Sequence, residues 1–385
     1  MFSIPKVATR PVALRPPRID ATFQPNRKNQ SRPRLKGPMM KQLPLGKTGL
    51  MVSELCLGTM TWGSQNTESE GHDQIALALD HDVTFWDTAE MYPTNPIKAE
   101  TIGGTEKVIG NWFARNGGRD KVVLATKITG AGNDYVRDGA PVTGASLRTA
   151  VEESLVRLQT DYIDLYQIHW PNRGSYHFRR IWGFKPKTDK QTVVDHMEDV
   201  LQSAQKLVEE GKIRAIGLSN ESVWGAANWL RIADQAGLPR MATVQNEYSL
   251  LCRQFDSDWA ELAAMEDMPL LAFSPLAAGL LTGKYAGGVI PDGTRRVNTP
   301  DLGGRISPYV FEAVAAYMGI AARHGLDASQ MALAFCLTRP FPIVPIIGAT
   351  SLAQLRSNID AAGLELSPEV MAEIDQAHRA YPAPY

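Results

Sequence analysis

The sequence has few cysteines and no long hydrophobic segment. Its three cysteines, Cys56, Cys252 and Cys336, lie far apart in a chain of 385 residues. They match neither a zinc motif nor a disulfide framework, so we expect ordinary buried thiols, a reducing compartment and a cytoplasmic location. No apolar run approaches the roughly 18 residues of a membrane span. The sequence therefore argues against both a disulfide-stabilised secreted protein and a membrane protein.

Two common signatures of catalytic sites are also missing. None of the seven histidines belongs to an H-x-H or H-E-x-x-H motif. A metal-dependent barrel enzyme would therefore lack its usual ligands, and we predict no metal site. The segment "CLGTMTWGS" (56–64) does not fit the G-x-G-x-x-G turn of an open, doubly wound dinucleotide-binding sheet. That fold is the structural alternative.

Acidic residues are scarce at the start of the chain. Residues 1–38 contain nine Lys or Arg, seven prolines and a single acid, Asp20. The remainder has 31 basic and 40 acidic residues, so it gives no indication of a nucleic-acid partner. We interpret 1–38 as a disordered, basic, proline-rich tail. An organelle transit peptide and a natural start at Met39 or Met40 are the alternatives.

Residues 39–385 are predicted to form one domain in which short apolar runs alternate with longer helical patterns. Nearly continuous hydrophobicity is typical of parallel strands that are covered on both faces. The eight predicted strands span 53–58, 83–87, 122–127, 162–169, 213–219, 242–246, 269–274 and 342–348.

Helical periodicity is clearest in the segments 146–160, 192–212 and 307–325. Eight strands interleaved with helices predict an α/β fold, a closed (β/α)8 TIM barrel. The hairpin-like segment 43–52 is expected to cap the floor of the barrel. Two long loops, 171–190 and 275–306, follow the fourth and seventh strands, and long loops in compact domains usually serve as lids or binding loops.

Polar residues stand where the predicted strands end. Asp87, Lys127 and His169 close the second, third and fourth strands, and Tyr92 follows Asp87. Each alone has an ordinary interpretation, as an ion pair or a packed side chain. Together they favour a site, because active sites of this barrel are built at the carboxyl ends of its strands.

This group of four suggests acid–base chemistry. The lysine is expected to lower the pKa of the Tyr92 phenol and to be paired by the aspartate. Tyr92 would then donate a proton, and His169 would orient a carbonyl oxygen.

Several motifs occur together in a characteristic order. They are "GTMTWG" (58–63), "WDTAEMYP" (86–93), "DYIDLYQIHWP" (161–171), "GKIRAIGLSN" (211–220), "FSPLAAGLLTGKY" (273–285) and "IIGATSLAQLRSNI" (346–359). With them the sequence resembles the aldo-keto reductase superfamily over about residues 40–385. It is most similar to the bacterial Tas-type NADP(H)-dependent members.

The resemblance implies NADPH-dependent reduction of a small aldehyde or ketone. Its catalytic tetrad falls on Asp87, Tyr92, Lys127 and His169, with Tyr92 as general acid. The alternative is a regulatory subunit that binds the nicotinamide cofactor, like the potassium-channel β subunits. Those relatives replace the histidine with asparagine, so His169 favours an enzyme. The oligomeric state is left open.

Aromatic residues are expected to rim the pocket and favour an apolar or aromatic carbonyl, with a place in the core as the alternative for each: Trp62, Tyr92, Trp170 and Trp182. The resemblance assigns the cofactor positions. Phe273 either stacks on the nicotinamide or packs in the barrel. The cofactor positions are Gly58, Thr59, Met60, Asp87, Ser219, Asn220, Gln245, Phe273, Ser274, Pro275, Leu276, Gly279, Leu280, Gly283, Lys284, Gly348, Ala349, Thr350, Ser351, Gln354 and Asn358.

One feature departs from the family pattern. Its well-studied members place a basic residue near the position of Gln354 to bind the 2′-phosphate. The cations available here are Arg356, Arg295, Arg296 and Arg305. An arginine suits a phosphate, but the sequence does not single one out, so the choice of NADPH over NADH rests on the resemblance.

Overall fold

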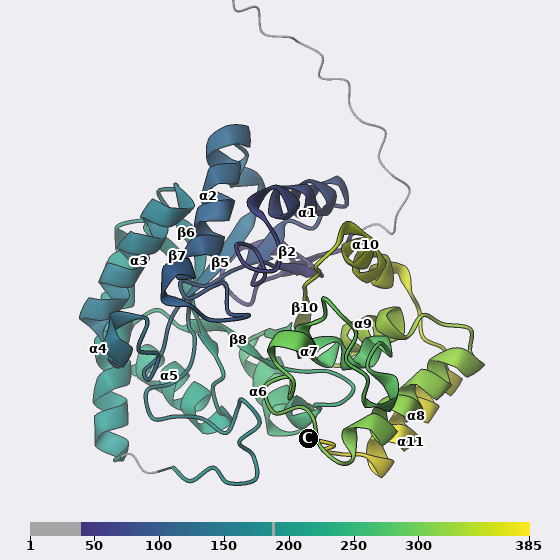
Figure 1. Ribbon diagram of the computed structural model, residues 1–385. Helices are drawn as coiled ribbons and strands as arrows, with labels where there is room; N and C mark the ends of the chain where they lie inside the picture. Colours follow the sequence, from purple (N-terminus) through teal and green to yellow (C-terminus); the bar gives the residue numbers. More distant parts are fainter. Residues whose placement is uncertain (1–39, 187–188) are drawn as a thin grey trace, which may run out of the picture. The chain divides into compact units, whose positions relative to one another are not determined.

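The computed structural model describes residues 40–186 and 189–385. In this part of the chain eight parallel strands close into a barrel, in the order β10-β3-β4-β5-β6-β7-β8-β9, with helices around it (Figure 1). The predicted (β/α)8 barrel is therefore confirmed. The barrel strands are β3 (Cys56–Gly58), β4 (Phe85–Asp87), β5 (Val123–Ile128), β6 (Ile163–Ile168), β7 (Ile213–Ser219), β8 (Met241–Glu247), β9 (Leu270–Phe273) and β10 (Ile343–Ile347).

The helices alternate with the strands as the periodicity indicates. Among the described residues, none is long and apolar enough to cross a membrane. They are α1 (Glu68–Asp80), α2 (Gly104–Asn116), α3 (Gly144–Leu158), α4 (Lys190–Glu209), α5 (Val223–Ala236), α6 (Asp258–Glu266), α7 (Arg295–Asn298), α8 (Val310–Arg323), α9 (Ala328–Leu337), α10 (Leu352–Asp360) and α11 (Pro368–Ala380).

Side-chain caps set the start of several helices. α3 begins two residues earlier than predicted, because Thr143 and Ser146 cap each other reciprocally. α8 is an exception: it begins later than predicted, at Val310, and its N-cap residue Tyr309 makes no side-chain cap hydrogen bond, although the Val310 N–H donates to Ser307 Oγ at 3.1 Å. The helix predicted from the periodicity of 146–160 is confirmed in the main, since α3 ends at Leu158 and buries Leu147 and Leu158 fully.

Alternation along the strands divides side chains between the barrel interior and the helix layer. The inward set forms one hydrophobic cluster that includes Cys56, Phe85, Ala125, Leu165 and Leu271. Two residues further along four of these strands, the same face carries Gly58, Asp87, Lys127 and Gln167. An apolar floor and a polar layer above it therefore follow from the two-residue period.

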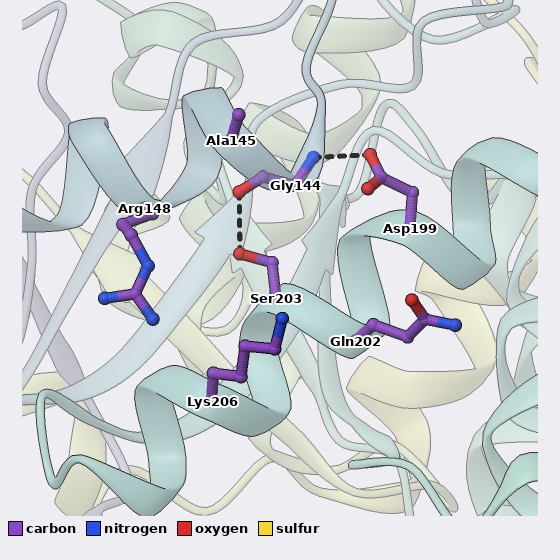
Figure 2. A pocket seen from close by; sticks show the side chains of 7 residues that line it. All are labelled: Gly144, Ala145, Arg148, Asp199, Gln202, Ser203 and Lys206. Carbon is purple, nitrogen blue, oxygen red and sulfur yellow. Dashed lines mark hydrogen bonds between the residues drawn. The ribbon is translucent and has the colours of Figure 1, made fainter.

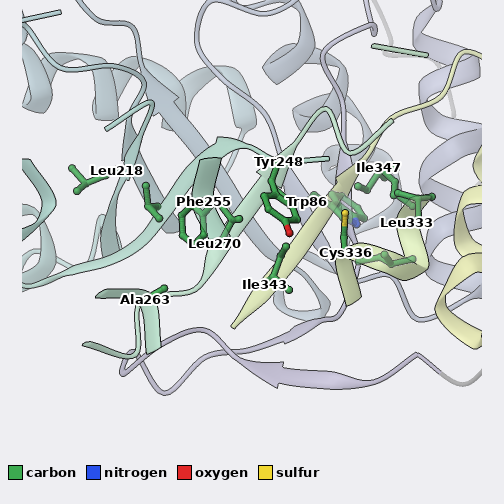
Figure 3. Packing of buried hydrophobic residues seen from close by; sticks show 14 of the residues in the cluster. Trp86, Leu218, Tyr248, Phe255, Ala263, Leu270, Leu333, Cys336, Ile343 and Ile347 are labelled. Carbon is green, nitrogen blue, oxygen red and sulfur yellow. The ribbon is translucent and has the colours of Figure 1, made fainter. Parts of the chain in front are cut away.

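The outward set packs against the helices in the large core (Figure 3). Trp86 lies fully buried there, its ring stacked on Phe113 of α2 with centroids 5.7 Å apart. Tyr248 meets Phe255 edge-on at 6.5 Å. This packing fixes the strands that carry the polar layer.

The predicted hairpin is present and covers the barrel floor. β1 (Gln42–Pro44) pairs antiparallel with β2 (Met51–Ser53). Leu45, Leu50 and Val52 belong to the same cluster as the inward strand residues. The hairpin therefore closes the amino-terminal end of the barrel with apolar side chains.

Two long connections follow the fourth and seventh barrel strands, as predicted. Residues 169–189 join β6 to α4, and residues 274–309 join β9 to α8. The second, which we call the lid, contains the 3-10 turns η5 (Ala277–Thr282) and η6 (Ala286–Gly288) and the short helix α7. The predictions for residues 1–38, including the domain boundary, lie outside the described residues and stay predictions.

The hairpin cap leads to a stability prediction. Leu50 is buried in the floor cluster, whereas its neighbour Met51 is 51% exposed. Leu50→Ala is expected to lower the free energy of unfolding by about 3 kcal/mol, because it removes buried methyl groups and leaves a cavity. Met51→Ala should change it by less than about 0.5 kcal/mol. Urea unfolding followed by circular dichroism measures both, and similar small losses in the two variants would show that the hairpin does not stabilise the barrel through Leu50.

Candidate active site

A large cavity opens where the barrel strands end. Its volume is about 700 Å³, within the usual range of ligand pockets. Most of the predicted site residues line it: Gly58, Thr59, Met60, Asp87, Tyr92, His169, Trp170, Ser219, Asn220, Gln245, Phe273, Ser274, Pro275, Leu276, Gly279, Lys284, Gly348, Ala349, Thr350, Gln354 and Asn358.

Some predicted residues lie elsewhere. Trp62, expected at the rim, is fully buried in the core, where its indole N–H donates to Gln74 Oε1 at 3.2 Å. Leu280 is also a core residue, and Gly283 ends η5 with a φ of 78°. Ser351 caps α10 by accepting from the Gln354 N–H. The structure thus corrects the expected position of Trp62 at the rim.

Lys127 and Asp87 form a buried ion pair beneath the cavity. Lys127 Nζ donates to Asp87 Oδ2 and to the Thr88 carbonyl, both at 2.7 Å, and the lysine is fully buried. The other carboxylate oxygen, Oδ1, accepts from the Gln245 and Gln167 amides at 2.8 and 3.2 Å. Complete hydrogen bonding of this kind is what allows two charges to remain in a dry interior.

Sequence reasoning missed Gln167. It lies two residues before His169 on β6, and side-chain alternation places both on one face of the strand. That signal was available in the sequence. The hydrogen bond to Asp87 could not be predicted, because it joins β6 to β4 across β5 and depends on the register of all three strands.

Tyr92 lies against this pair. Lys127 Nζ is 4.9 Å from the centroid of the Tyr92 ring. Burial raises the pKa of the Tyr92 phenol and outweighs the opposing effect of the lysine charge. The expected net lowering of the pKa is therefore wrong, because sequence reasoning counted the charge and not the desolvation. The phenol stays protonated at neutral pH.

A partly buried ion pair holds the loop that carries Tyr92. Arg137 donates to both carboxylate oxygens of Glu90 at 2.8 Å. It also donates to the Thr129 carbonyl at 2.7 Å. The loop after β4 is thereby tied to the end of β5, and Tyr92 is kept near Lys127.

His169 lies opposite Tyr92, with ring centroids 5.8 Å apart at 74°. Burial, with a smaller effect from the Lys127 charge, holds its pKa well below the usual value. The imidazole is therefore neutral at physiological pH. Its Nδ1 is buried and has no hydrogen-bond partner in the described part of the chain.

Asn220 and Ser219 are fixed at the end of β7. The Asn220 amide donates to the His169 carbonyl at 2.9 Å and to Ser219 Oγ at 3.1 Å. Asn220 has a φ of 51°, which asparagine tolerates better than most residues. Its Oδ1 is buried without a partner among the described residues. A buried acceptor in a cavity wall is suited to an amide donor such as a nicotinamide carboxamide.

The opposite end of the cavity suits a phosphate and an adenine. A Cβ built on Gly348 would meet no protein atom within 4 Å, so the backbone there faces open space. The Gln354 amide oxygen accepts from the Thr350 N–H at 3.0 Å, and Asn358 donates to the Gly348 carbonyl at 3.2 Å. Gly279 has a φ of 95°, which favours glycine. These residues fit a bound dinucleotide.

The four candidate arginines for the 2′-phosphate differ in what they contact. Arg356 is paired with Asp360 on α10. Arg296 is buried and donates to three backbone carbonyls of the lid. Arg305 donates to Glu247 Oε1 at 2.7 Å. Arg295 lines the cavity, its side chain makes no hydrogen bond or ion pair within residues 40–186 and 189–385, and its Nε is buried.

A second pocket, of about 210 Å³, lies between α3 and α4 (Figure 2). Asp199 accepts from the Gly144 N–H and Ser203 Oγ donates to the Gly144 carbonyl, both at 2.6 Å. These polar groups satisfy one another, in contrast to Asn220 and His169. In the described ranges no group of three or more His, Cys, Asp or Glu side chains is placed to hold a metal ion.

Comparison with known proteins points to one family. The model of the aldo/keto reductase family matches residues 54–379. The chain is 45% identical to "Protein tas" of Escherichia coli over 346 residues, covering 88% of this chain and 98% of that protein. It is 33% identical to "Uncharacterized oxidoreductase YrpG" of Bacillus subtilis over 86% of this chain and 94% of that protein.

A reductase of a fungus is also similar. "Norsolorinic acid reductase stcV" of Emericella nidulans is 31% identical over 339 residues, covering 85% of this chain and 78% of that protein.

The buried pair leads to a stability prediction. Lys127→Met leaves the Asp87 carboxylate buried without its cation and is expected to cost about 3–5 kcal/mol of folding stability. Adding Asp87→Asn removes the buried charge and keeps an acceptor for Gln245, so the double variant should regain at least half of the loss. Guanidinium denaturation measures both. A double variant no more stable than Lys127→Met would contradict this account.

Proposed function

The chain belongs to the aldo/keto reductase family, and we propose that it is an oxidoreductase that uses NADPH to reduce a small aldehyde or ketone to an alcohol. The observation that carries the proposal is the placement of Tyr92 beside the Lys127–Asp87 pair and opposite a neutral His169. The oxidoreductase names of the Bacillus and Emericella relatives support the same class.

Bound NADPH supplies the hydride that reduces the carbonyl carbon. Tyr92 donates the proton to the carbonyl oxygen, so that an alcohol and NADP⁺ result. Because the phenol stays protonated at neutral pH, the proton is present when the oxygen becomes negative. The ammonium of Lys127 then stabilises the phenolate that remains.

His169 is proposed to hold the carbonyl oxygen. A neutral imidazole donates one hydrogen bond and leaves the proton transfer to the tyrosine. The Asn220 amide, bonded to the His169 carbonyl, fixes the backbone from which the ring projects. Trp170, whose ring lies 5.0 Å from that of His169, adds an aromatic wall for the substrate.

The cofactor is proposed to extend from the strand ends to α10. Gly58, Thr59, Met60, Ser219, Asn220 and Gln245 would surround the nicotinamide end, and Phe273 lines the cavity where it can stack. Residues Ser274 to Lys284 would hold the pyrophosphate, and Gly348 to Asn358 the adenosine. Arg295, whose side chain has no hydrogen bond or ion pair among the described residues, is the proposed ligand of a cofactor phosphate.

The proposed acid has a direct test. Tyr92→Phe is expected to lower the rate of NADPH oxidation with aromatic aldehydes by at least 100-fold, since the proton donor is lost. The exposed Tyr135 provides the control, and Tyr135→Phe should retain full activity. Absorbance at 340 nm follows the reaction. Undiminished turnover by Tyr92→Phe would contradict the role of Tyr92, and tight NADPH binding with no turnover by the wild type would favour the regulatory alternative.

The pKa shifts predict a pH profile. The raised pKa of Tyr92 keeps its acid form to higher pH, and the lowered pKa of His169 keeps the imidazole neutral to lower pH. Reductive kcat/KM at saturating NADPH should thus vary less than about twofold between pH 6 and 8. Alcohol oxidation, which needs the Tyr92 phenolate, should rise steeply with pH. A reductive rate that changes with a midpoint near 6.5 would show that His169 titrates and would contradict this assignment.

A further inference from the structure

The cavity carries more positive charge than its own carboxylates balance. Of the charged side chains that line it in the described part of the chain, Asp87 is the acid, and Arg179, Lys284, Arg295 and Arg305 are the bases. Asp87 is already paired with Lys127. The mouth is therefore suited to anionic ligands, of which the proposed cofactor is one.

Arg179 lies on a different segment from the residues proposed to hold the cofactor, to which it is linked through Glu247 and Arg305, a donor to Ser274 Oγ at 3.2 Å. Arg179 is on the loop after β6, whereas the cofactor positions lie at the ends of β3, β4, β7 and β8 and on the connections after β9 and β10. Phe178, its neighbour, meets the Trp170 ring edge-on at 5.9 Å. Trp170 in turn adjoins His169, which faces Tyr92. A continuous aromatic wall therefore leads from the proposed acid to Arg179.

The guanidinium of Arg179 is only partly satisfied. Its Nη1 donates to Glu247 Oε2 at 2.9 Å, and its side chain is 15% exposed. Glu247 is shared, because its Oε1 accepts from Arg305 at 2.7 Å and from the Tyr385 hydroxyl at 3.1 Å. Arg179 Nε is buried and has no partner in the described residues. One carboxylate thus serves two arginines, and donors remain for a ligand.

Burial and the charge of Arg305 lower the pKa of Arg179, so the cation is held in an unfavourable environment. A Cβ on Gly303 would lie 3.2 Å from Arg179 Nη2, which places the side chain against the lid. An anion at this position would relieve the repulsion between the arginines and bridge the two long loops.

We propose that Arg179 is a specificity-determining residue that binds a carboxylate of the substrate, so that the preferred substrates are aromatic aldehydes or ketones carrying a carboxylate remote from the carbonyl. The proposal rests on the proposed reductase function. The aromatic wall would hold the ring, with the carbonyl at Tyr92 and the carboxylate on the guanidinium fork. The cofactor's phosphates are the competing source of the anion, and the experiment separates the two.

The experiment compares 4-carboxybenzaldehyde with methyl 4-formylbenzoate, its neutral ester. For the wild type, kcat/KM should be at least about tenfold higher for the carboxylate, as expected for a charge-assisted hydrogen bond. Arg179→Gln should reduce this ratio to near one, mainly through the KM of the carboxylate. Arg180→Gln is the matched control, since Arg180 is the exposed neighbour, and should keep the ratio. Arg179→Lys, which retains the charge and loses the fork, should keep an intermediate ratio.

Two binding measurements complete the test. Fluorescence titration should give the same NADPH Kd for Arg179→Gln as for the wild type within about twofold, whereas Arg295→Gln should weaken it. Calorimetry with 4-(hydroxymethyl)benzoate, the alcohol product, should show binding at least about tenfold weaker in Arg179→Gln.

Each outcome has a defined meaning. No preference for the carboxylate in the wild type, or a preference retained in Arg179→Gln, overturns the proposal while the reductase function stands. A loss of NADPH affinity in Arg179→Gln assigns the residue to the cofactor and also overturns it. If neither aldehyde is reduced, the proposed function fails, and unequal binding of the alcohol product by the wild type and Arg179→Gln still supports the carboxylate site.

Discussion

The site depends on one interaction, the buried ion pair between Lys127 and Asp87. An ammonium in a dry interior is costly unless its charge and all its hydrogens are matched. Asp87 supplies the charge, and the Gln167 and Gln245 amides occupy the second carboxylate oxygen. A fixed positive charge can therefore stay next to a phenol. Without the pair, the same burial that keeps Tyr92 protonated would leave its phenolate without a stabilising partner.

The rest of the fold can be understood as support for that pair. The hairpin and the inward strand residues form a dry floor one layer below it, and the helices fix the strands from outside. Side chains alternate between the two faces of a strand, so a shift in strand register that displaced the polar layer would also displace the apolar floor. The positions of Asp87 and Lys127 are thus set by hydrophobic packing that involves neither of them.

The sequence predicted the features that depend on local patterns, and it failed for those that depend on contacts between segments far apart in the chain. The strands, the hairpin and the convergence of Asp87, Tyr92, Lys127 and His169 follow from local patterns and from one property of the barrel. The net pKa shift of Tyr92 depends on burial, which no local pattern reveals, and the prediction failed there. Trp62 was misplaced because an aromatic residue in the turn after a strand suits a rim and a core equally. The network of Arg179, Glu247 and Arg305 joins three segments distant in sequence, so no periodicity indicated it.

The distribution of charge in the cavity also constrains how ligands lie in it. At the bottom of the cavity, the charges of Lys127 and Asp87 cancel and His169 is neutral. The bottom of the cavity therefore offers hydrogen bonds and little net electric field. Higher up, Lys284, Arg295 and Arg179 are not matched by carboxylates in the described part of the chain, apart from the shared Glu247. Attraction between unit charges is stronger where water is excluded. We therefore expect phosphates and carboxylates to be held near the rim and an uncharged carbonyl or carboxamide to reach the bottom of the cavity. This separation would orient a ligand with one charged and one neutral end before it contacts Tyr92.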